Sequence, residues 1–229
     1  MVTSRKILEI KYRISETAMA LFLDEGYANV TVEAVAEASD VSRRTVFRHF
    51  ESKDELVFPD HAERLGLVER CLVESAPDAD PVEVVIAATE ESLREFISRP
   101  DLVLRRYQLT RVVPELRKRE VIEHERYVAL TRSFLRDHLA PDAPPFQPMG
   151  LAALIDAIHR SALGNWVRTG GTTDPLAELA AGMEWVRRLV DHQSTFSATP
   201  LLLAVIPDSP HARRVLTSLT GEGEELRPP

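Results

Sequence analysis

Apolar residues recur at helical spacing along most of the chain. In the first such segment Ile14, Ala18, Leu21 and Phe22 stand at positions i, i+4, i+7 and i+8, which places them on one face of a helix. Gly26 follows as a helix stop. No segment alternates apolar and polar residues for long enough to predict a sheet. The pattern therefore predicts an all-α protein.

Two short helices are predicted directly after the first. Thr31 and Ser42 are hydroxyl residues of the kind that cap helix N-termini. Val32, Val35 and Ala36 follow the first cap at the spacing of one buried face. The N-terminal part of the chain is thus expected to hold three helices.

The rest of the chain is expected to be helical as well. Apolar stripes bounded by proline and glycine predict further helices over residues 53–74, 82–97, 101–112, 115–139, 149–169 and 175–192. Pro59 falls in the early turns of the first of these, which predicts a kink or a late start. Gly170 and Gly171 form a short turn, so the last two helices are expected to make an antiparallel hairpin. After Ser194 the helical pattern breaks down.

Composition limits the classes of protein that remain. The 229 residues suffice for one large domain or for a small domain fused to a larger one. The single cysteine, Cys71, excludes an intrachain disulfide and a cysteine-based zinc cluster. No apolar run approaches the roughly 18 residues that indicate a membrane span, and the first residues lack the apolar stretch of a secretory signal. A cytoplasmic protein with no membrane partner is expected.

Net charge argues at first against a nucleic-acid partner, because the chain carries a formal charge of −8. Its distribution matters more than the total. Five basic residues crowd into the segment 43–53, namely Arg43, Arg44, Arg48, His49 and Lys53. A basic patch on an acidic protein is therefore possible, and nonspecific affinity for DNA is expected to be weak.

The third predicted helix has two different faces. From Arg43, a step of about 100° per residue places Val46 and Phe50 on one side and Arg44 and Arg48 nearly opposite. A short helix with a cationic outer face, preceded by a tight turn and a second short helix, suits insertion into a major groove. A solvated charged face on an ordinary helical bundle is the alternative that this pattern leaves open.

Residues 14–56 resemble the N-terminal DNA-binding domain of the TetR family along the whole segment. The stretch Ile14 to Tyr27 resembles the first helix of the family with its glycine-aromatic ending, and Thr31 to Ala38 resembles the second. Val41 to Leu56 resembles the recognition helix and the His-Phe-x-x-Lys-x-x-Leu junction that follows it. The resemblance implies a helix-turn-helix domain.

Site residues follow from this resemblance position by position. It implies phosphate contacts for Thr31, Ser42, Thr45, His49 and Lys53, with Arg43 and Arg44 nearest the base edges and Arg48 on the same face. The alternative for Thr31 and Ser42 is that they only cap their helices, and the alternative for Lys53 is that it is only solvated.

Three positions depart from the family pattern. Phe47 stands where a tyrosine is common, so a hydroxyl contact to phosphate is missing, and Phe47 is expected to be a weak DNA-binding residue. Asp40 occupies a turn position that is usually glycine, which predicts a left-handed backbone at some strain. Arg44 replaces a small residue, which should add a groove contact.

The C-terminal part resembles the family only in layout, a helical ligand-binding core followed by two helices that pair between subunits. The penultimate helix has a stripe of small residues beside a stripe of larger apolar ones, and these are Ala153, Ala157, Ser161, Gly164 and Leu151, Leu154, Ile158, Leu163. A homodimer through the last two long helices is predicted, with intrachain packing as the alternative. The predicted domains are residues 1–52 for DNA binding, 53–194 for effector binding and dimerisation, and a partly flexible C-terminal extension over 195–229.

Candidate effector residues are polar or aromatic side chains on otherwise apolar helices. They are Arg105, Tyr107, Arg111, Tyr127, His159 and Trp166, with Arg106 and His124 beside them. The arginines suggest a lipophilic or anionic small molecule, and the alternative, which the sequence favours, is that they are simply solvated surface charges. No cofactor is expected.

The sequence therefore predicts a transcriptional regulator that binds specific double-stranded DNA. It is expected to be a dimeric repressor that a small molecule releases from a pseudo-palindromic operator. The alternative is an all-helical interaction or ligand-carrier protein with a vestigial DNA-binding domain. An enzyme is not expected, since Gly-x-Ser-x-Gly and phosphate-cradling glycine motifs are missing. Asp60, His61 and Glu63 are interpreted as a charged helix face rather than a metal site.

Overall fold

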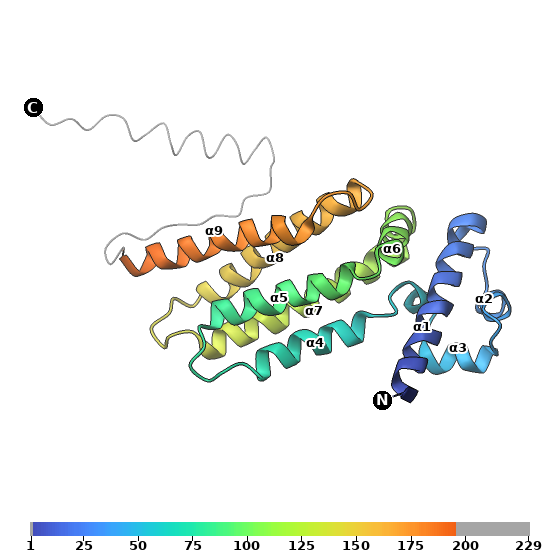
Figure 1. The fold of residues 1–229 in the computed structure, drawn as a ribbon, viewed down its shortest axis with the longest axis horizontal. Helices are drawn as coiled ribbons and strands as arrows, with labels where there is room; N and C mark the ends of the chain where they lie inside the picture. The colour runs from blue at the N-terminus through green and yellow to red at the C-terminus, as the bar shows by residue number, and fades with distance from the viewer. Residues whose placement is uncertain (1, 196–229) are drawn as a thin grey trace, which may run out of the picture. The chain divides into compact units, whose positions relative to one another are not determined.

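The computed structural model describes residues 2–195, and within them every regular element is a helix (Figure 1). The α-helices are α1 (Val2–Leu21), α2 (Val32–Ala38), α3 (Arg43–His49), α4 (His61–Val73), α5 (Pro81–Ile97), α6 (Pro100–Val112), α7 (Pro114–His138), α8 (Gln147–Arg168) and α9 (Pro175–Thr195). A π-helical turn η1 (Phe22–Gly26) extends α1, and a 3-10 turn η2 (Asp54–Val57) precedes α4. The all-α prediction is confirmed. The extension predicted over residues 195–229 lies outside the described residues, apart from Thr195.

The helix that follows α3 starts late, which is one of the two outcomes that Pro59 predicted. Instead of one helix from residue 53, the chain forms η2, and α4 begins only at His61. Pro59 cannot donate a backbone hydrogen bond, so it separates the two elements. Phe58 and Pro59 are both buried at this bend.

One apolar core joins the N-terminal helices to the helices that follow them. Ile14, Phe22 and Val46 belong to the same buried cluster as Leu109 of α6 and Leu116 of α7. Residues as far as Leu189 accordingly form one compact unit. The domain boundary predicted between residues 52 and 53 falls inside this unit and stays a prediction.

The C-terminal part is a bundle in which α4, α5 and α7 run side by side (Figure 1). Helix α8 packs on α7 and α5, and Asn165 of α8 donates a hydrogen bond to Glu178 of α9 at 2.6 Å. A side chain at Gly182 of α9 would clash with Ile158 of α8, so the two helices approach closely at this glycine. No helix in the range 2–195 is both long and apolar enough to cross a membrane.

Candidate DNA-binding face and effector cavity

Capping residues fix where the two short helices begin. The Thr31 hydroxyl accepts a hydrogen bond from the backbone N–H of Ala34 at 3.1 Å, and the Ser42 hydroxyl accepts one from Thr45 at 3.1 Å. Between the helices Asp40 has a φ of 53°, the left-handed conformation predicted for this turn. The capping interactions and the turn geometry position α3 relative to α2.

Helix α3 has the two faces that its sequence predicted. Val46 and Phe50 are 1% and 2% exposed, whereas Arg44 and Arg48 are exposed. Phe47 is 43% exposed on the same outer side. No ion pair or hydrogen bond of the Arg44 or Arg48 side chain is present within the described part of the chain, so both guanidinium groups are available to an external anion.

Arg43 has a partner already. Its Nε atom lies 2.9 Å from Oε1 of Glu33 on α2, and its guanidinium lies 5.3 Å from the centroid of the Phe47 ring. Both members of the ion pair are exposed, so its stabilising effect is small. The pair nevertheless draws the Arg43 side chain toward α2 and links the two helices of the motif.

His49 and Lys53 contribute less free positive charge than their sequence positions suggest. Burial, with the charge of Arg48 adding to it, lowers the pKa of His49, so that its ring is neutral at pH 7. Lys53 donates a hydrogen bond to the backbone oxygen of Tyr27, and its ammonium lies 4.3 Å from the Tyr27 ring centroid. Burial also lowers the pKa of Lys53. This lysine therefore fastens the segment after α3 to the end of the first helix.

A cavity of about 560 Å³ lies within the C-terminal bundle, lined by residues of helices α4 to α8 and by Phe58. Val68, Phe96, Val103 and Ile155 are among its apolar lining residues. Its charged lining consists of six arginines and four carboxylates, which are Arg64, Arg106, Arg111, Arg117, Arg160, Arg168 and Glu120, Glu123, Glu125, Asp156. Cationic groups thus exceed anionic ones, although the whole chain is acidic.

Arg106 contributes a buried charge to one wall of the cavity. Arg106, only 3% exposed, places Nη2 2.6 Å from Oδ1 of Asp60 and donates through Nε to the backbone oxygen of Val57 at 2.9 Å. Burial would raise the pKa of Asp60, but the charges of Arg106 and Arg64 outweigh it and hold that pKa at about 2. This pair is ionised at neutral pH.

Glu123 and His61 lie next to that pair. Nε2 of His61 is 2.5 Å from Oε2 of Glu123, and Arg119 and Arg126 approach the same carboxylate at 2.6 and 3.0 Å. Burial, reinforced by the charge of Arg64, lowers the pKa of His61 to about 3, so the imidazole is neutral at pH 7. The carboxylate is therefore balanced by arginines rather than by the histidine.

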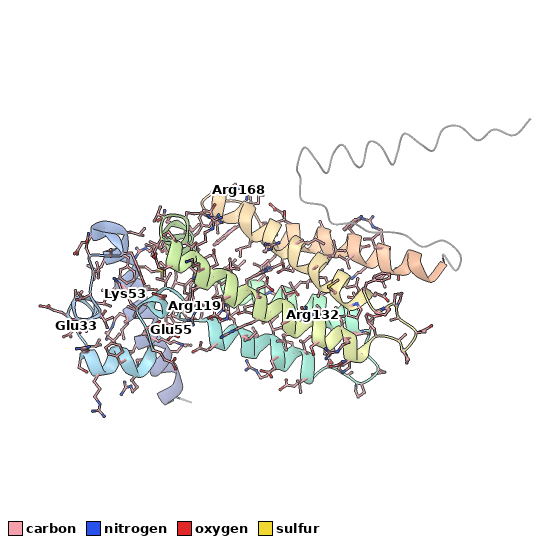
Figure 2. The ribbon with its side chains drawn as sticks, turned by 180° about the vertical axis from the view of Figure 1, so that it is seen from behind. Glu33, Lys53, Glu55, Arg119, Arg132 and Arg168 are labelled. Carbon is pink, nitrogen blue, oxygen red and sulfur yellow. The ribbon has the colours of Figure 1, made fainter. Side chains whose placement is uncertain are left out.

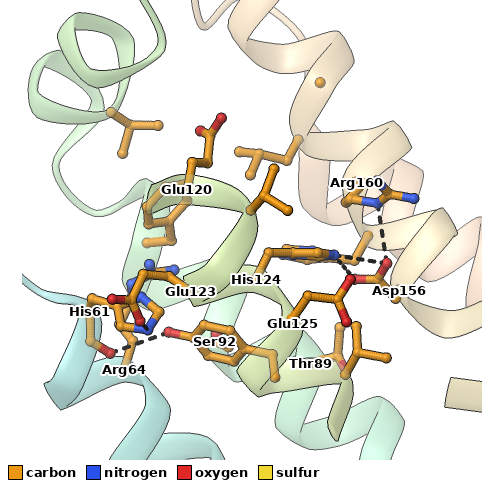
Figure 3. Close-up of a pocket in the computed structure, with 18 of the residues that line it drawn as sticks. His61, Arg64, Thr89, Ser92, Glu120, Glu123, His124, Glu125, Asp156 and Arg160 are labelled. Carbon is orange, nitrogen blue, oxygen red and sulfur yellow. Dashed lines mark hydrogen bonds and ion pairs between the residues drawn. The ribbon is translucent and has the colours of Figure 1, made fainter. Parts of the chain in front are cut away.

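A second polar group comes from α7 and α8. His124 Nε2 lies 2.9 Å from Oδ1 of Asp156, whose Oδ2 is 3.1 Å from Nε of Arg160 (Figure 3). His159 lines the cavity near them, and burial lowers its pKa to about 4. A ligand here would meet a neutral histidine and a paired carboxylate.

Four of the six predicted effector residues line this cavity, namely Tyr107, Arg111, Tyr127 and His159, and so do Arg106 and His124. Arg105 and Trp166 are not among the lining residues. The Arg105 guanidinium lies 3.5 Å from the backbone oxygen of Glu16, and Trp166 is 5% exposed in a core cluster with Phe96. The roles of all six toward an effector stay predictions.

Sequence reasoning missed many residues of the cavity wall, and among them are Glu123, Arg64 and His61. Glu123 stands in a strongly charged stretch of sequence and gives no sign of burial, and Arg64 resembles any surface arginine. In the sequence His61 stands between Asp60 and Glu63, and the three together indicate a charged helix face. In the structure Asp60 and His61 are buried, whereas Glu63 points away and pairs with Lys11 at 2.7 Å. Within the described residues no cluster of three or more His, Cys, Asp or Glu is placed to hold a metal ion.

Sequence identity to the curated relatives is highest in the first part of the chain. Residues 14–58 match the family described as bacterial regulatory proteins, tetR family, which confirms the resemblance seen over residues 14–56. The HTH-type transcriptional regulator TcmR of Streptomyces glaucescens is 46% identical over 52 residues, which cover 23% of each chain. The chain therefore aligns with less than a quarter of that relative's length.

Matches that extend over more of the chain have lower sequence identity. The putative mycofactocin biosynthesis transcriptional regulator MftR of Mycobacterium tuberculosis is 22% identical over 158 residues, covering 69% of this chain and 79% of the relative. Among solved structures, the complex of SmeT with triclosan superposes with a TM-score of 0.58 at 16% identity, covering 79% of this chain and 91% of the other. At that identity the likeness concerns the fold.

Proposed function

We propose that this chain, whose residues 14–58 match the family described as bacterial regulatory proteins, tetR family, is a dimeric transcriptional repressor that an effector in the cavity releases from DNA. The observation that carries the proposal is the division of α3. Val46 and Phe50 anchor the helix in the core, while Arg44 and Arg48 are exposed and unpaired within the described residues. Such a helix can enter a major groove without disturbing its own packing.

Contacts to DNA would divide between bases and phosphates. Arg44 and Arg48 are the unpaired cations of α3, and a guanidinium can bind guanine O6 and N7 in bidentate fashion. Thr31, Ser42 and Thr45 lie at the starts of α2 and α3, where backbone N–H groups also favour phosphate. Arg43 would contribute beside Arg44 after yielding part of its interaction with Glu33. His49 and Lys53, partly buried, would add less, and the apolar Phe47 would pack against sugar.

A homodimer would bring two such helices to one operator. Ala177, Ala181 and Trp185 follow one another at intervals of four residues, and all three are exposed on α9. Ala153 and Ser161 are exposed on α8. Small residues and one large aromatic side chain suit close packing against a second copy across a twofold axis. Two linked recognition helices would convert a modest affinity for each half-site into tight binding.

The effector is proposed to be a lipophilic molecule with an anionic group. Its apolar part would occupy the space between Val68, Phe96 and Ile155, and its anionic group would lie at the exposed arginines Arg111 and Arg168. SmeT, which shares the fold, forms a complex with triclosan. A ligand that favours the DNA-incompetent arrangement of the two heads would lower operator affinity by population shift.

A mobility-shift assay tests the DNA-binding part of the proposal. Duplexes selected from a random pool by the purified protein are expected to bind with an affinity that falls by orders of magnitude between about 50 and about 200 mM salt. The variant Arg44→Ala should lose about tenfold or more in affinity, because a base contact contributes about 1–3 kcal/mol per site.

Arg132→Ala is the matched control, since Arg132 is an exposed arginine of α7 and lies far along the bundle from the α2–α3 motif (Figure 2). Its affinity should equal that of the wild type. Failure to select any duplex, or an Arg44→Ala variant that binds normally, would favour the alternative of an interaction or ligand-carrier protein with a vestigial DNA-binding domain.

A further inference from the structure

The short turn η2 joins the recognition helix to the helices around the cavity. Its residue Glu55 accepts a hydrogen bond through Oε2 from the backbone N–H of Glu51 at 2.7 Å. Glu51 directly follows Phe50, the residue that caps the C-terminus of α3. The Glu55 carboxylate therefore holds the backbone immediately after the recognition helix.

The second oxygen of Glu55 faces α7. Oε1 of Glu55 lies 3.2 Å from Nη2 of Arg119, and Nε of Arg119 lies 2.6 Å from Oε1 of Glu123, one turn farther along α7. Figure 2 shows Glu55 and Arg119 together where α7 passes η2. Three side chains thus connect the end of α3 with α7.

The last of these side chains belongs to the cavity wall. Glu123 lines the cavity and is 3% exposed. Arginines lie within ion-pair distance of both carboxylate oxygens. Within the described part of the chain, however, neither oxygen accepts an aligned hydrogen bond, and Nε2 of the neighbouring His61 makes none either. The arginines therefore hold Glu123 through ion pairs whose geometry is not that of aligned hydrogen bonds. A ligand donor that reaches this wall would have to compete with Arg119 or Arg126 for the carboxylate.

Helix α6 holds the other end of η2. Arg106 donates to the backbone oxygen of Val57, the last residue of the turn, and pairs with Asp60 just beyond it. Both helices that contact η2 in this way also line the cavity. A displacement of the cavity wall would therefore act directly on the turn that carries the end of α3.

We propose that Arg119 and Glu55 are positioning residues for the recognition helix, and that Glu123 is the cavity group through which ligand occupancy reaches them. This inference rests on the function proposed above. A hydroxyl or amine of the ligand that donates to Glu123 competes with Arg119 for the carboxylate. Arg119 then holds Glu55 less firmly, the backbone after α3 gains freedom, and DNA binding must restore the lost order.

Hydrogen–deuterium exchange on the DNA-free protein tests the connection directly. Glu123→Gln and Arg119→Gln each remove one link with little change in volume. Backbone amides of residues 47–57 are expected to exchange about threefold faster or more in both variants. Glu125→Gln and Arg117→Gln are the matched controls, because both residues are exposed lining residues of α7 without a partner in the described chain, and they should leave that segment unchanged.

A double-mutant cycle on operator affinity completes the test. Glu55→Gln and Glu123→Gln should each weaken binding about threefold or more, and the double variant should be no weaker than the poorer single variant. Additive losses, or faster exchange confined to α7, would overturn the inference. If no duplex is bound at all, the proposed function fails, while the exchange of residues 47–57 still decides whether the connection exists.

Discussion

Replacement of Asp60 by asparagine is expected to destabilise the protein strongly. Asn keeps the shape of the side chain and removes the charge that balances Arg106, which is 3% exposed. Breaking a buried ion pair from one side costs about 3–5 kcal/mol, because the remaining charge stays buried. The lowered pKa of Asp60, about 2 against an ordinary 3.8, corresponds to roughly 2.5 kcal/mol from the same interaction. A loss of about 2.5–5 kcal/mol is therefore expected.

The melting temperature measures this loss. For a chain of this size about 1 kcal/mol corresponds to roughly 2–4 °C, so thermal unfolding followed by circular dichroism at pH 7 should show a decrease of about 5–20 °C for Asp60→Asn. Glu69→Gln, an exposed carboxylate on the same helix, is the control and should melt with the wild type. Combining Asp60→Asn with Arg106→Gln should cost less than the sum of the single variants.

The contribution of Asp60 to the stability of the fold depends on pH with a definite sign. Because the folded pKa of Asp60 lies below the unfolded one, its contribution is fully present above about pH 4 and disappears as the pH falls through about 2. The difference in melting temperature between the wild type and Asp60→Asn should therefore disappear in that acidic range. A melting temperature of Asp60→Asn within about 2 °C of the wild type at pH 7 would refute the reasoning.

Three other substitutions test a DNA contact, the packing of α9 on α8 and the proposed dimer face. Phe47→Tyr should raise operator affinity about fivefold per half-site in a mobility-shift assay, because a hydroxyl bonded to phosphate contributes about 1 kcal/mol net. Gly182→Ala should lower the melting temperature, since the new methyl group would clash with Ile158, whereas Gly150→Ala, with open space around it, should not. Ala181→Arg should convert a dimer into monomers in light scattering, and an unchanged mass would contradict the dimer face.

Local patterns were sufficient for the DNA-binding segment. The two faces of α3 follow from the spacing of Val46, Phe50, Arg44 and Arg48. The positive φ of Asp40 is implied by the family resemblance, since Asp40 stands at a turn position that is usually glycine. These properties depend on residues a few positions apart. They are visible in the sequence because short helices are built from local interactions.

The cavity wall could not be predicted in the same way. Glu123 is buried because Arg119 and Arg126 on its own helix and His61 on α4 surround it. The burial of Arg106 likewise requires Asp60, 46 positions away. Ion pairs of this kind arise from tertiary packing, and the same residue types elsewhere in the chain are solvated. For Lys53 the sequence indicated a free cation, whereas packing against Tyr27 encloses it.

The shared apolar core has a practical consequence for building chimeric sensors. Ile14 and Phe22 of the DNA-binding segment pack in one cluster with Leu102 and Leu109 of α6 and Leu116 of α7. A foreign DNA-binding head spliced on at residue 52 would meet these leucines with side chains of another shape, and the graft would lose stability and communication together. A productive exchange would have to carry the facing residues of α6 and α7 along with the head, so that the unit of modularity is larger than the sequence motif.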